Sequence, residues 1–299
     1  MNKVEIRAHL YILLATILVA GSFLATEKLA GVINPFSLIL LRFLAAFLLL
    51  APFILFRRRY RSKILSTMPR AMIISFFYAA YFVLMFVSLE ETTALNTGTL
   101  YTLVPLVTAI LCIFIFKDKI TLTQWIVYLI GIIGTCGVIF NANLELFLSF
   151  KLNHGDLVYL FSILLMAGYS ISMKLLYKND TPVVLVFCTL IGGAIWMFLI
   201  LIIMQEPLNW QLLDVELGFY MAYLVVMTTL VTLYLYQKGT IALGPKSVMS
   251  YIYLNPAVVA IFVYFIDGTK ISLEVLGFIL ITMASTAILQ ISINNRKKL

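Results

Sequence analysis

Long apolar runs separated by short polar connections fill the whole chain. A helix needs about 20 mostly apolar residues to cross a bilayer, and ten runs come close to that length. These runs are residues 9–26, 35–56, 71–89, 94–116, 122–140, 157–176, 182–204, 217–236, 245–266 and 273–293. The pattern therefore predicts an all-α integral membrane protein with ten transmembrane helices.

The fourth and ninth runs repeat one pattern at an offset of 151 residues, which aligns Pro105 with Pro256 and Lys119 with Lys270. Each proline lies well inside its run, where it removes a backbone donor and crowds the preceding turn. We therefore predict helix kinks at Pro105 and Pro256. Paired broken helices in corresponding halves of a membrane chain indicate a transport site.

The repeat extends over the rest of the chain, since Pro35 aligns with Pro182 at an offset of 147. Residues 1–143 and 144–299 then form two units of five spans each. An odd number of spans makes the second unit enter the membrane from the opposite side. The prediction is two inverted five-helix repeats related by a two-fold axis in the membrane plane, an arrangement typical of transporters.

The charges are few, at 11% of residues, but they are basic in excess, with a net charge of +8. If the N-terminus lies inside, 17 Lys and Arg residues fall on the cytoplasmic side and three fall outside. This bias predicts a multi-pass protein of the cell membrane with both termini cytoplasmic. The basic residues also suit anionic lipid headgroups on that side, so nucleic acid is not an expected partner.

Several stretches carry a family resemblance, namely NPFSLILLRFLAA with Arg42, TTALNTGTLYTLVP, AGYSISMK and GPKSVMSYIYLNPAVVA. Their order, spacing and duplication resemble the EamA-domain branch of the drug/metabolite transporter superfamily over essentially the whole chain. The chain departs from that family at Ala20–Gly21–Ser22, where the family tends to have Trp-Gly-Ser, and at KDKIT, where it usually has Gly-Glu. The resemblance implies transport of amino acids, related metabolites or drugs, often outward by proton exchange.

Polar stripes precede the proline in both the fourth and the ninth span. Side chains spaced three or four apart lie on one face of a helix. Polar residues can also hold membrane helices together, but their presence in both repeat-related spans favours the lining of a cavity. The candidate substrate-binding residues are Asn96, Thr99 and Thr102 in the fourth span and Ser247, Tyr251 and Asn255 in the ninth.

Tyr78 and Tyr81 are three residues apart in the third span and share a face. Tyrosine offers an apolar wall with a polar end, so both are further candidates for substrate binding. The alternative is an interfacial anchor, because tyrosines also populate the belts at membrane surfaces.

Arg42 lies inside the second span, about 10 Å along the helix from Pro35. Because a cation inside a bilayer needs a partner or water, Arg42 either binds a carboxylate of the substrate or protein at a gate, or has a structural role. The structural role, in which it snorkels or clamps helix ends, is favoured. Glu27 is the nearest candidate partner.

Glu90, at the outer turn after the third span, is a candidate for gating or charge relay beside Arg42 and Glu27. The turn holds two adjacent carboxylates, Glu90 and Glu91, which point in different directions if they are helical. A solvated turn without a transport role is the favoured interpretation of this pair.

No phosphate-binding glycine loop, metal-ligand cluster or nucleophile–base pair is visible, so we expect no cofactor, no metal and no enzyme activity. The predicted function is a secondary active transporter that moves a small molecule, such as an amino acid or related compound, by alternating access with proton or exchange coupling. Uptake by a facilitator or exchanger is the alternative. A lipid-modifying membrane enzyme is disfavoured. A monomer is compatible with the sequence.

Overall fold

The computed structural model describes residues 3–29, 32–268 and 270–296. Within these ranges it does not describe the side chains of Phe23, Glu27, Ala94, Asp267, Asn295 and Arg296. Every regular element in the described part of the chain is helical. Ten helical segments are long and apolar enough to cross a membrane. The predicted all-α architecture with ten membrane-spanning segments is therefore confirmed.

Seven of the spans are single helices. They are α1 (Lys3–Leu29), α2 (Pro35–Leu55), α4 (Ile64–Leu89), α7 (Leu122–Ile139), α9 (His154–Leu175), α10 (Pro182–Met204) and α15 (Leu273–Arg296). The other three spans are divided. The fourth span consists of α5 (Ala94–Tyr101) and α6 (Val104–Phe116), and the eighth of α11 (Val215–Val225), η2 (Val226–Val231) and α12 (Thr232–Leu243). The ninth consists of α13 (Pro245–Met249), η3 (Ser250–Leu254) and α14 (Asn255–Asp267). The connections contain α3 (Arg58–Arg61), α8 (Leu144–Leu148) and η1 (Trp210–Leu212).

Local sequence sets the helix starts. Prolines stand in the first turn of α2, α10 and α13, where their missing N–H has no intrahelical partner to lose. The Asn34 side chain caps α2 by accepting a hydrogen bond from the Phe36 backbone N–H at 2.8 Å. Gly244, between α12 and α13, has a φ of 86°, a conformation that costs glycine little. It lets the chain reverse between the eighth and ninth spans.

Three spans are clearly longer than their apolar pattern predicts, and the first of them is α1, which runs from Lys3 to Leu29 rather than over residues 9–26. α4 begins at Ile64 rather than residue 71, and the eighth span continues to Leu243 rather than residue 236. Polar residues obscured both ends. Gln237, for example, is buried and donates from Nε2 to Thr189 Oγ1 at 3.1 Å, so a residue typical of a loop belongs to the helix interior.

The two spans with predicted kinks at Pro105 and Pro256 are interrupted just before those prolines. A turn at Thr102 and Leu103 separates α5 from α6, and Pro105 lies in the first turn of α6. In the ninth span the 3₁₀ segment η3 precedes α14, and Pro256 lies in the first turn of α14. Because a helix begins afresh at each site, neither proline removes an internal hydrogen bond.

Repeat-related spans pack in matching pairs. The second span packs against the seventh (α2 with α10), and the fifth packs against the tenth (α7 with α15). The first also packs against the eighth (α1 with α12), as the third does against the sixth (α4 with α9). If each span is replaced by its counterpart in the other half, the same four pairs result. The packing is therefore consistent with the predicted inverted repeat.

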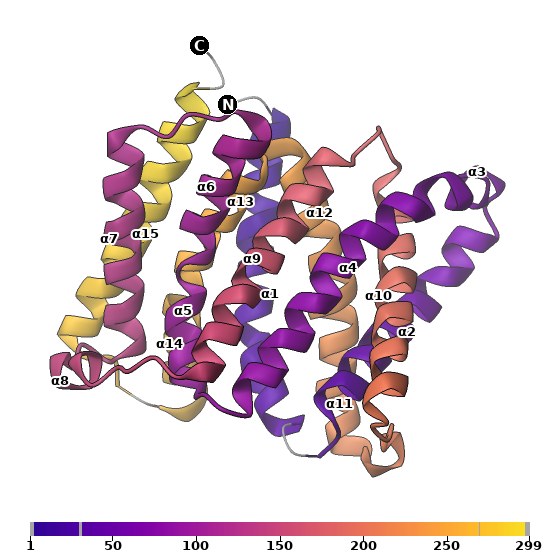
Figure 1. Ribbon diagram of the computed structural model, residues 1–299, viewed down its shortest axis with the longest axis horizontal. Helices are drawn as coiled ribbons and strands as arrows, with labels where there is room; N and C mark the ends of the chain where they lie inside the picture. The colour runs from indigo at the N-terminus through magenta and orange to yellow at the C-terminus, as the bar shows by residue number, and fades with distance from the viewer. Residues whose placement is uncertain (1–2, 30–31, 269, 297–299) are drawn as a thin grey trace.

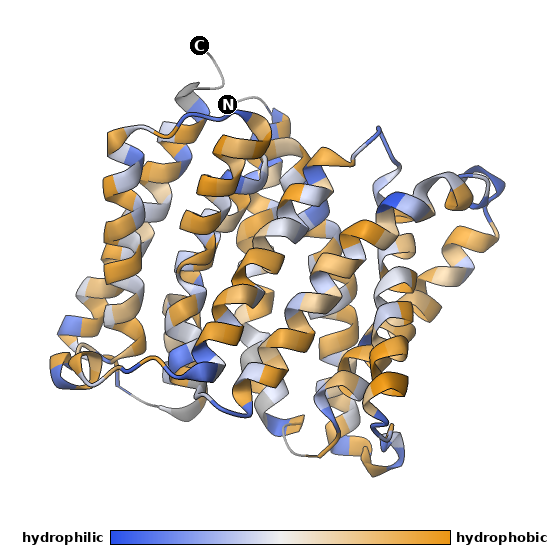
Figure 2. Ribbon diagram, viewed as in Figure 1, coloured by the Kyte–Doolittle hydropathy of each residue, from blue (hydrophilic) through white to orange (hydrophobic). Residues whose placement is uncertain are grey.

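Both chain ends lie at one end of the bundle, together with α3 and the α6–α7 connection, which we call the terminal face (Figure 1). The opposite face carries α8 and the α4–α5 connection. Hydrophilic residues concentrate near these two ends, and the helices between them are largely apolar (Figure 2). Large apolar side chains such as Phe114, Ile133, Ile203 and Leu280 are exposed on the helices, as a lipid-facing surface requires.

Candidate functional site

Tyrosines from four spans gather inside the bundle. The tyrosine cluster consists of Tyr78 and Tyr81 on α4, Tyr101 on α5, Tyr159 and Tyr169 on α9, and Tyr236 on α12. The rings of Tyr78 and Tyr169 lie with their centroids 4.6 Å apart at an interplanar angle of 31°. Those of Tyr81 and Tyr101 are 6.3 Å apart. Tyr78 thus contacts a ring of the other half of the chain, and Tyr81 contacts a ring of its own half.

The hydroxyl groups of the tyrosine cluster lie near one another and near a neighbouring helix. The Tyr81 hydroxyl lies near those of Tyr101 and Tyr159, and the Tyr236 hydroxyl lies near Thr16 on α1. Tyr81, Tyr159 and Tyr169 are buried, whereas Tyr78, Tyr101 and Tyr236 retain some accessible surface. The cluster therefore offers apolar ring faces together with polar groups that can donate or accept.

Arg42 is buried on α2, with 8% of its surface exposed. Its Nε donates to Thr229 Oγ1 at 3.0 Å and its Nη2 donates to Thr228 Oγ1 at 3.1 Å. Both threonines belong to η2, a π-helical turn in the other half of the chain. Their hydroxyls also donate to the Leu224 carbonyl, which satisfies backbone that the wider turn leaves unpaired.

No ion pair found among the described residues includes Arg42. The side chain of Glu27, its predicted partner, lies outside the described part of the chain. The two threonine contacts use only part of the donor capacity of the guanidinium. A cation at the bilayer centre costs at least ~2.5 kcal/mol, and neutral hydroxyls compensate it less than a carboxylate does. The Tyr78 hydroxyl lies within electrostatic reach of Arg42, so this charge adjoins the tyrosine cluster.

A buried carboxylate joins the two halves at the opposite face. Asp156, in the first turn of α9, is 0% exposed. It accepts hydrogen bonds from Thr92 Oγ1 at 2.5 Å, Asn96 Nδ2 at 2.9 Å and the Asn153 backbone N–H at 2.9 Å. We call these bonds the Asp156 contact. Gly155 permits the approach, because a Cβ there would lie 2.7 Å from the Ser88 carbonyl oxygen.

Asp156 was not among the functional candidates predicted from the sequence. The available signal was the Asn153–Asp156 spacing of a helix capping box, which the structure contains. A capping box is usually a local feature, so it does not indicate that its carboxylate will reach across to another helix. The partner Asn96 was predicted to bind substrate, and the structure places its amide on Asp156.

A corresponding contact lies at the terminal face. His9 Nδ1 on α1 is 2.8 Å from Tyr251 Oη on η3, and His9 Nε2 is 3.3 Å from Asn294 Nδ2 on α15. We call this pair of interactions the His9 contact. It joins the first helix of one half to two elements of the other half, and it engages Tyr251, another predicted substrate-binding residue.

The remaining predicted residues are distributed along the two divided spans. The hydroxyl of Thr99 donates to the Leu95 carbonyl and that of Thr102 to the Thr99 carbonyl, both at 2.7 Å. Ser247 is hydrogen-bonded to Gln290 on α15. Asn255 is buried, and its Oδ1 has no hydrogen-bond partner among the described residues. No hydrogen bond found among the described residues joins the two divided spans through these positions. Their role in binding substrate stays a prediction.

Glu90 is exposed at the end of α4, and its neighbour Glu91 lies 2.7 Å from His154 Nδ1. The side chains of Glu91 and His154 are both largely exposed, so their interaction is screened by water and contributes little to stability. The structure therefore places Glu90 in a solvated turn on the opposite face, outside the tyrosine cluster.

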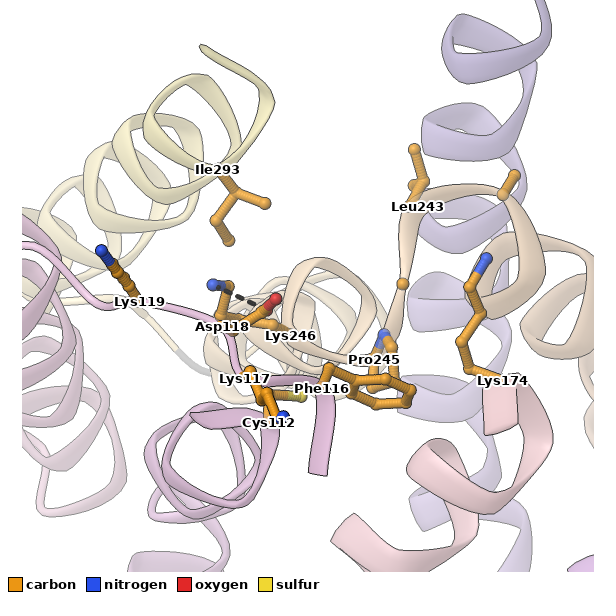
Figure 3. Close-up of a pocket in the computed structure, with 12 residues that line it drawn as sticks. Cys112, Phe116, Lys117, Asp118, Lys119, Lys174, Leu243, Pro245, Lys246 and Ile293 are labelled. Atoms are coloured by element: carbon orange, nitrogen blue, oxygen red, sulfur yellow. Dashed lines mark ion pairs between the residues drawn. The ribbon is translucent and has the colours of Figure 1, made fainter. Parts of the chain in front are cut away.

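A cavity of about 680 Å³ opens between the halves at the terminal face, and we call it the vestibule (Figure 3). Its charged lining comprises Lys117, Lys119, Lys174, Lys246 and Asp118. Lys246 Nζ is 3.1 Å from Asp118 Oδ2, and Lys174 Nζ donates to the Ile241 carbonyl at 2.5 Å. Because basic residues outnumber the acid, the vestibule carries a net positive charge.

The described residues contain no group of three or more His, Cys, Asp or Glu side chains that could hold a metal ion. Cys112, Cys136 and Cys188 are buried and are not in disulfides. The chemistry that the described side chains assemble consists of hydrogen bonding, aromatic contact and positive charge.

The comparisons with known proteins agree with this architecture. The model of the EamA-like transporter family matches residues 6–140 and 153–291. Uncharacterized transporter YyaM of Bacillus subtilis (strain 168) is 25% identical over 201 residues, which are 67% of this chain and 66% of that protein. The match thus spans slightly less than two thirds of the relative's length. One solved crystal structure has a TM-score of 0.74 and 18% identity, covers 97% of this chain and 98% of its own, and shows the fold alone.

Proposed function

Because this chain belongs to the EamA-like transporter family, we propose that it is a secondary active transporter that moves a small metabolite by alternating access. Its ten apolar spans make it a multi-pass membrane protein. The proposed location is the cell membrane, with the terminal face cytoplasmic. The relative in Bacillus subtilis is also named as a transporter.

The observation that carries the proposal is the position of Arg42 and the tyrosine cluster between two contacts that join the halves. The Asp156 contact lies toward the opposite face and the His9 contact toward the terminal face. A substrate bound at the cluster would be reached from one face when one contact opens, and from the other face when the other contact opens. Two such gates around one site are what alternating access requires.

The interrupted spans supply places where such a movement can occur. The breaks before Pro105 and Pro256 and the π-helical turn η2 each lie within a span that contributes to the interface between the halves. Fewer regular backbone hydrogen bonds cross these breaks than cross an unbroken helix, so bending there costs less. The gating segments would be α5 at one face and α13 with η3 at the other.

Proton coupling, or exchange against a second substrate, is the proposed energy source, because the sequence contains no nucleotide-binding loop. Outward movement of an amino acid or related compound is the proposed direction. The alternative is uptake of a metabolite by facilitated transport or exchange, which would use the same site and gates. Export and uptake are distinguished by the gradient that drives the flux.

The test is reconstitution of the purified protein in liposomes with a panel of radiolabelled amino acids and related metabolites. We expect saturable flux of at least one compound that an imposed proton gradient or a counter-substrate accelerates. Flux that neither gradient changes would assign a facilitator instead. No saturable flux of any compound under either gradient, from protein that remains folded, would contradict the proposal.

A further inference from the structure

The charge of Arg42 is the feature of the interior that the protein's own described residues leave least compensated. We infer that the transported molecule carries a carboxylate that binds Arg42, and an apolar or aromatic body that packs against the tyrosine cluster. This inference rests on the proposed function and adds the chemical class of the substrate.

The guanidinium is already positioned for such a ligand. Thr228 and Thr229 hold its Nη2 and Nε at 3.1 and 3.0 Å, which fixes the plane of the group on one side. No hydrogen bond found among the described residues uses Nη1, so its donors are available to a carboxylate. Charge-assisted bonds of this kind are about twice as strong as neutral ones and depend on the fixed geometry of the arginine fork.

The tyrosine cluster is suited to the rest of the molecule. Tyr78 lies within electrostatic reach of Arg42, and the centroid of its ring lies 4.6 Å from that of Tyr169, with the two rings tilted by 31°. A ligand whose carboxylate binds Arg42 would therefore place its body near these two rings. Aromatic faces contact an apolar or aromatic group well, and the hydroxyls of Tyr101 and Tyr236 can hydrogen-bond any polar substituent.

The same charges disfavour a cationic substrate. Arg42 would repel a ligand amine, and no described carboxylate belongs to the tyrosine cluster. Tyrosine faces attract cations by about 0.5–2 kcal/mol, which at close range is less than the repulsion between two unit charges in a partly desolvated interior. The ligand class is therefore an amphipathic anion.

The vestibule supports this conclusion independently. Its lining carries four lysines and one aspartate, and both halves of the chain contribute to it (Figure 3). A concave surface of one sign raises the local concentration of oppositely charged solutes and their rate of association. Anions at that face would be attracted toward the interior, while cations would be repelled.

The experiment compares four probes of similar shape that differ in charge: phenylpropionate, its neutral amide phenylpropanamide, zwitterionic phenylalanine and cationic phenylethylamine. Binding to the purified protein is measured through the ligand-dependent rise in its thermal unfolding temperature, which reports affinity for the native state. Transport is measured by counterflow in liposomes. We expect phenylpropionate to bind and move best and phenylethylamine least.

Arg42→Gln removes the charge and keeps a polar side chain of similar length. We expect it to weaken phenylpropionate binding by at least ~30-fold, the usual effect of deleting one partner of a buried charge pair. Binding of phenylpropanamide should change little. Arg57→Gln is the matched control, because Arg57 is exposed beside α3, and it should leave both affinities unchanged.

A structural role for Arg42 would give a different result. If the residue only clamped α2 to η2, Arg42→Gln would weaken the anion and the amide equally, and that outcome would overturn the inference. If Arg42→Gln did not fold, Arg42→Lys provides the comparison, since it keeps the charge and should retain the preference for the anion over the amide. Loss of that preference in a folded Lys variant would also count against the inference.

The failure of this inference is distinguishable from that of the proposed function. Preferred binding of the amine or the amide by the unaltered protein, or binding of none of the four probes, would overturn the anion class. The function would still stand if the wider metabolite panel showed coupled flux.

Discussion

Asp156 and His9 occupy equivalent positions in the two halves, 147 residues apart, and each crosses to the other half at a different face. Asp156 accepts hydrogen bonds from Thr92 and Asn96 at the opposite face. His9 contacts Tyr251 and Asn294 at the terminal face. One titratable side chain therefore lies at each end of the interface between the halves, as an inverted repeat would place them. The partners differ chemically, so the two contacts need not have equal strength.

Asp156→Asn should weaken the closure of the opposite face. The amide retains one acceptor oxygen, but it presents an NH₂ group to a site where three donors converge. The loss of a buried charge-assisted bond should lower the free energy of unfolding by about 2 kcal/mol. A reporter cysteine replacing Thr99, with the three native cysteines removed, should react about tenfold faster with a membrane-impermeant thiol reagent added at that face.

The control for this variant is Glu90→Gln, which removes an exposed carboxylate at the same face. It should change neither stability nor labelling. If Asp156→Asn labelled the reporter no faster than Glu90→Gln did, the Asp156 contact would not act as a gate.

His9→Phe should have the corresponding effect at the terminal face. It keeps an aromatic ring beside Tyr251, whose centroid lies 6.2 Å from that of His9, but it removes the two polar interactions. Native Cys112 lines the vestibule and is 1% exposed, so it serves as the reporter once Cys136 and Cys188 are replaced. Losing polar interactions worth about 1 kcal/mol should raise its labelling rate roughly three- to tenfold.

His154→Phe is the matched control, because His154 is the largely exposed histidine of the opposite face. It should leave the labelling of Cys112 unchanged. Equal labelling in the His9 and His154 variants would show that the His9 contact does not restrict access to the vestibule.

Gly131→Ala should destabilise the packing of α7 on the ninth span. A Cβ at Gly131 would lie 2.6 Å from the ring of Tyr253. That ring cannot easily move, because Tyr253 is fully buried and its hydroxyl donates to the Tyr128 carbonyl at 3.1 Å. Overpacking of this kind costs about 1–3 kcal/mol, which should appear as a lower thermal unfolding temperature in detergent.

Gly277→Ala tests whether the effect comes from the contact or from the glycine itself. Among the described residues outside its own helical turn, no atom lies within 4 Å of a Cβ built at Gly277, and alanine favours helix over glycine by about 1 kcal/mol. The variant should therefore be as stable as the parent or more so. A loss of stability as large as that of Gly131→Ala would refute the packing explanation.

The orientation predicted from the basic residues has a direct test. Ser62 lies beside α3 at the terminal face, and Ser149 follows α8 at the opposite face; both are exposed. In intact cells an impermeant thiol reagent should label a cysteine at position 149, and one at position 62 only after permeabilisation. The reverse pattern would contradict the cytoplasmic placement of the termini.

The number and bounds of most spans followed from local sequence. Lipid offers no hydrogen bonds, so each spanning segment must satisfy its own backbone as a helix and be apolar over its length. Proline likewise acts within its own turn, which is why Pro35, Pro182 and Pro245 marked helix starts. Only where polar residues continue a helix, as at Gln237, did the pattern misplace an end.

Only the tertiary structure decided which polar side chains meet. Spans that are apolar on every side give little indication of which face turns inward or which helix lies beside it. Tyr78 and Tyr81 were recognisable as neighbours on one helix face, but their contacts with Tyr169 and Tyr101 depend on how separate helices pack. The partners of Arg42 lie more than 180 residues away, on a π-helical turn. Helix packing, which depends on the shapes of many side chains at once, brings these residues together.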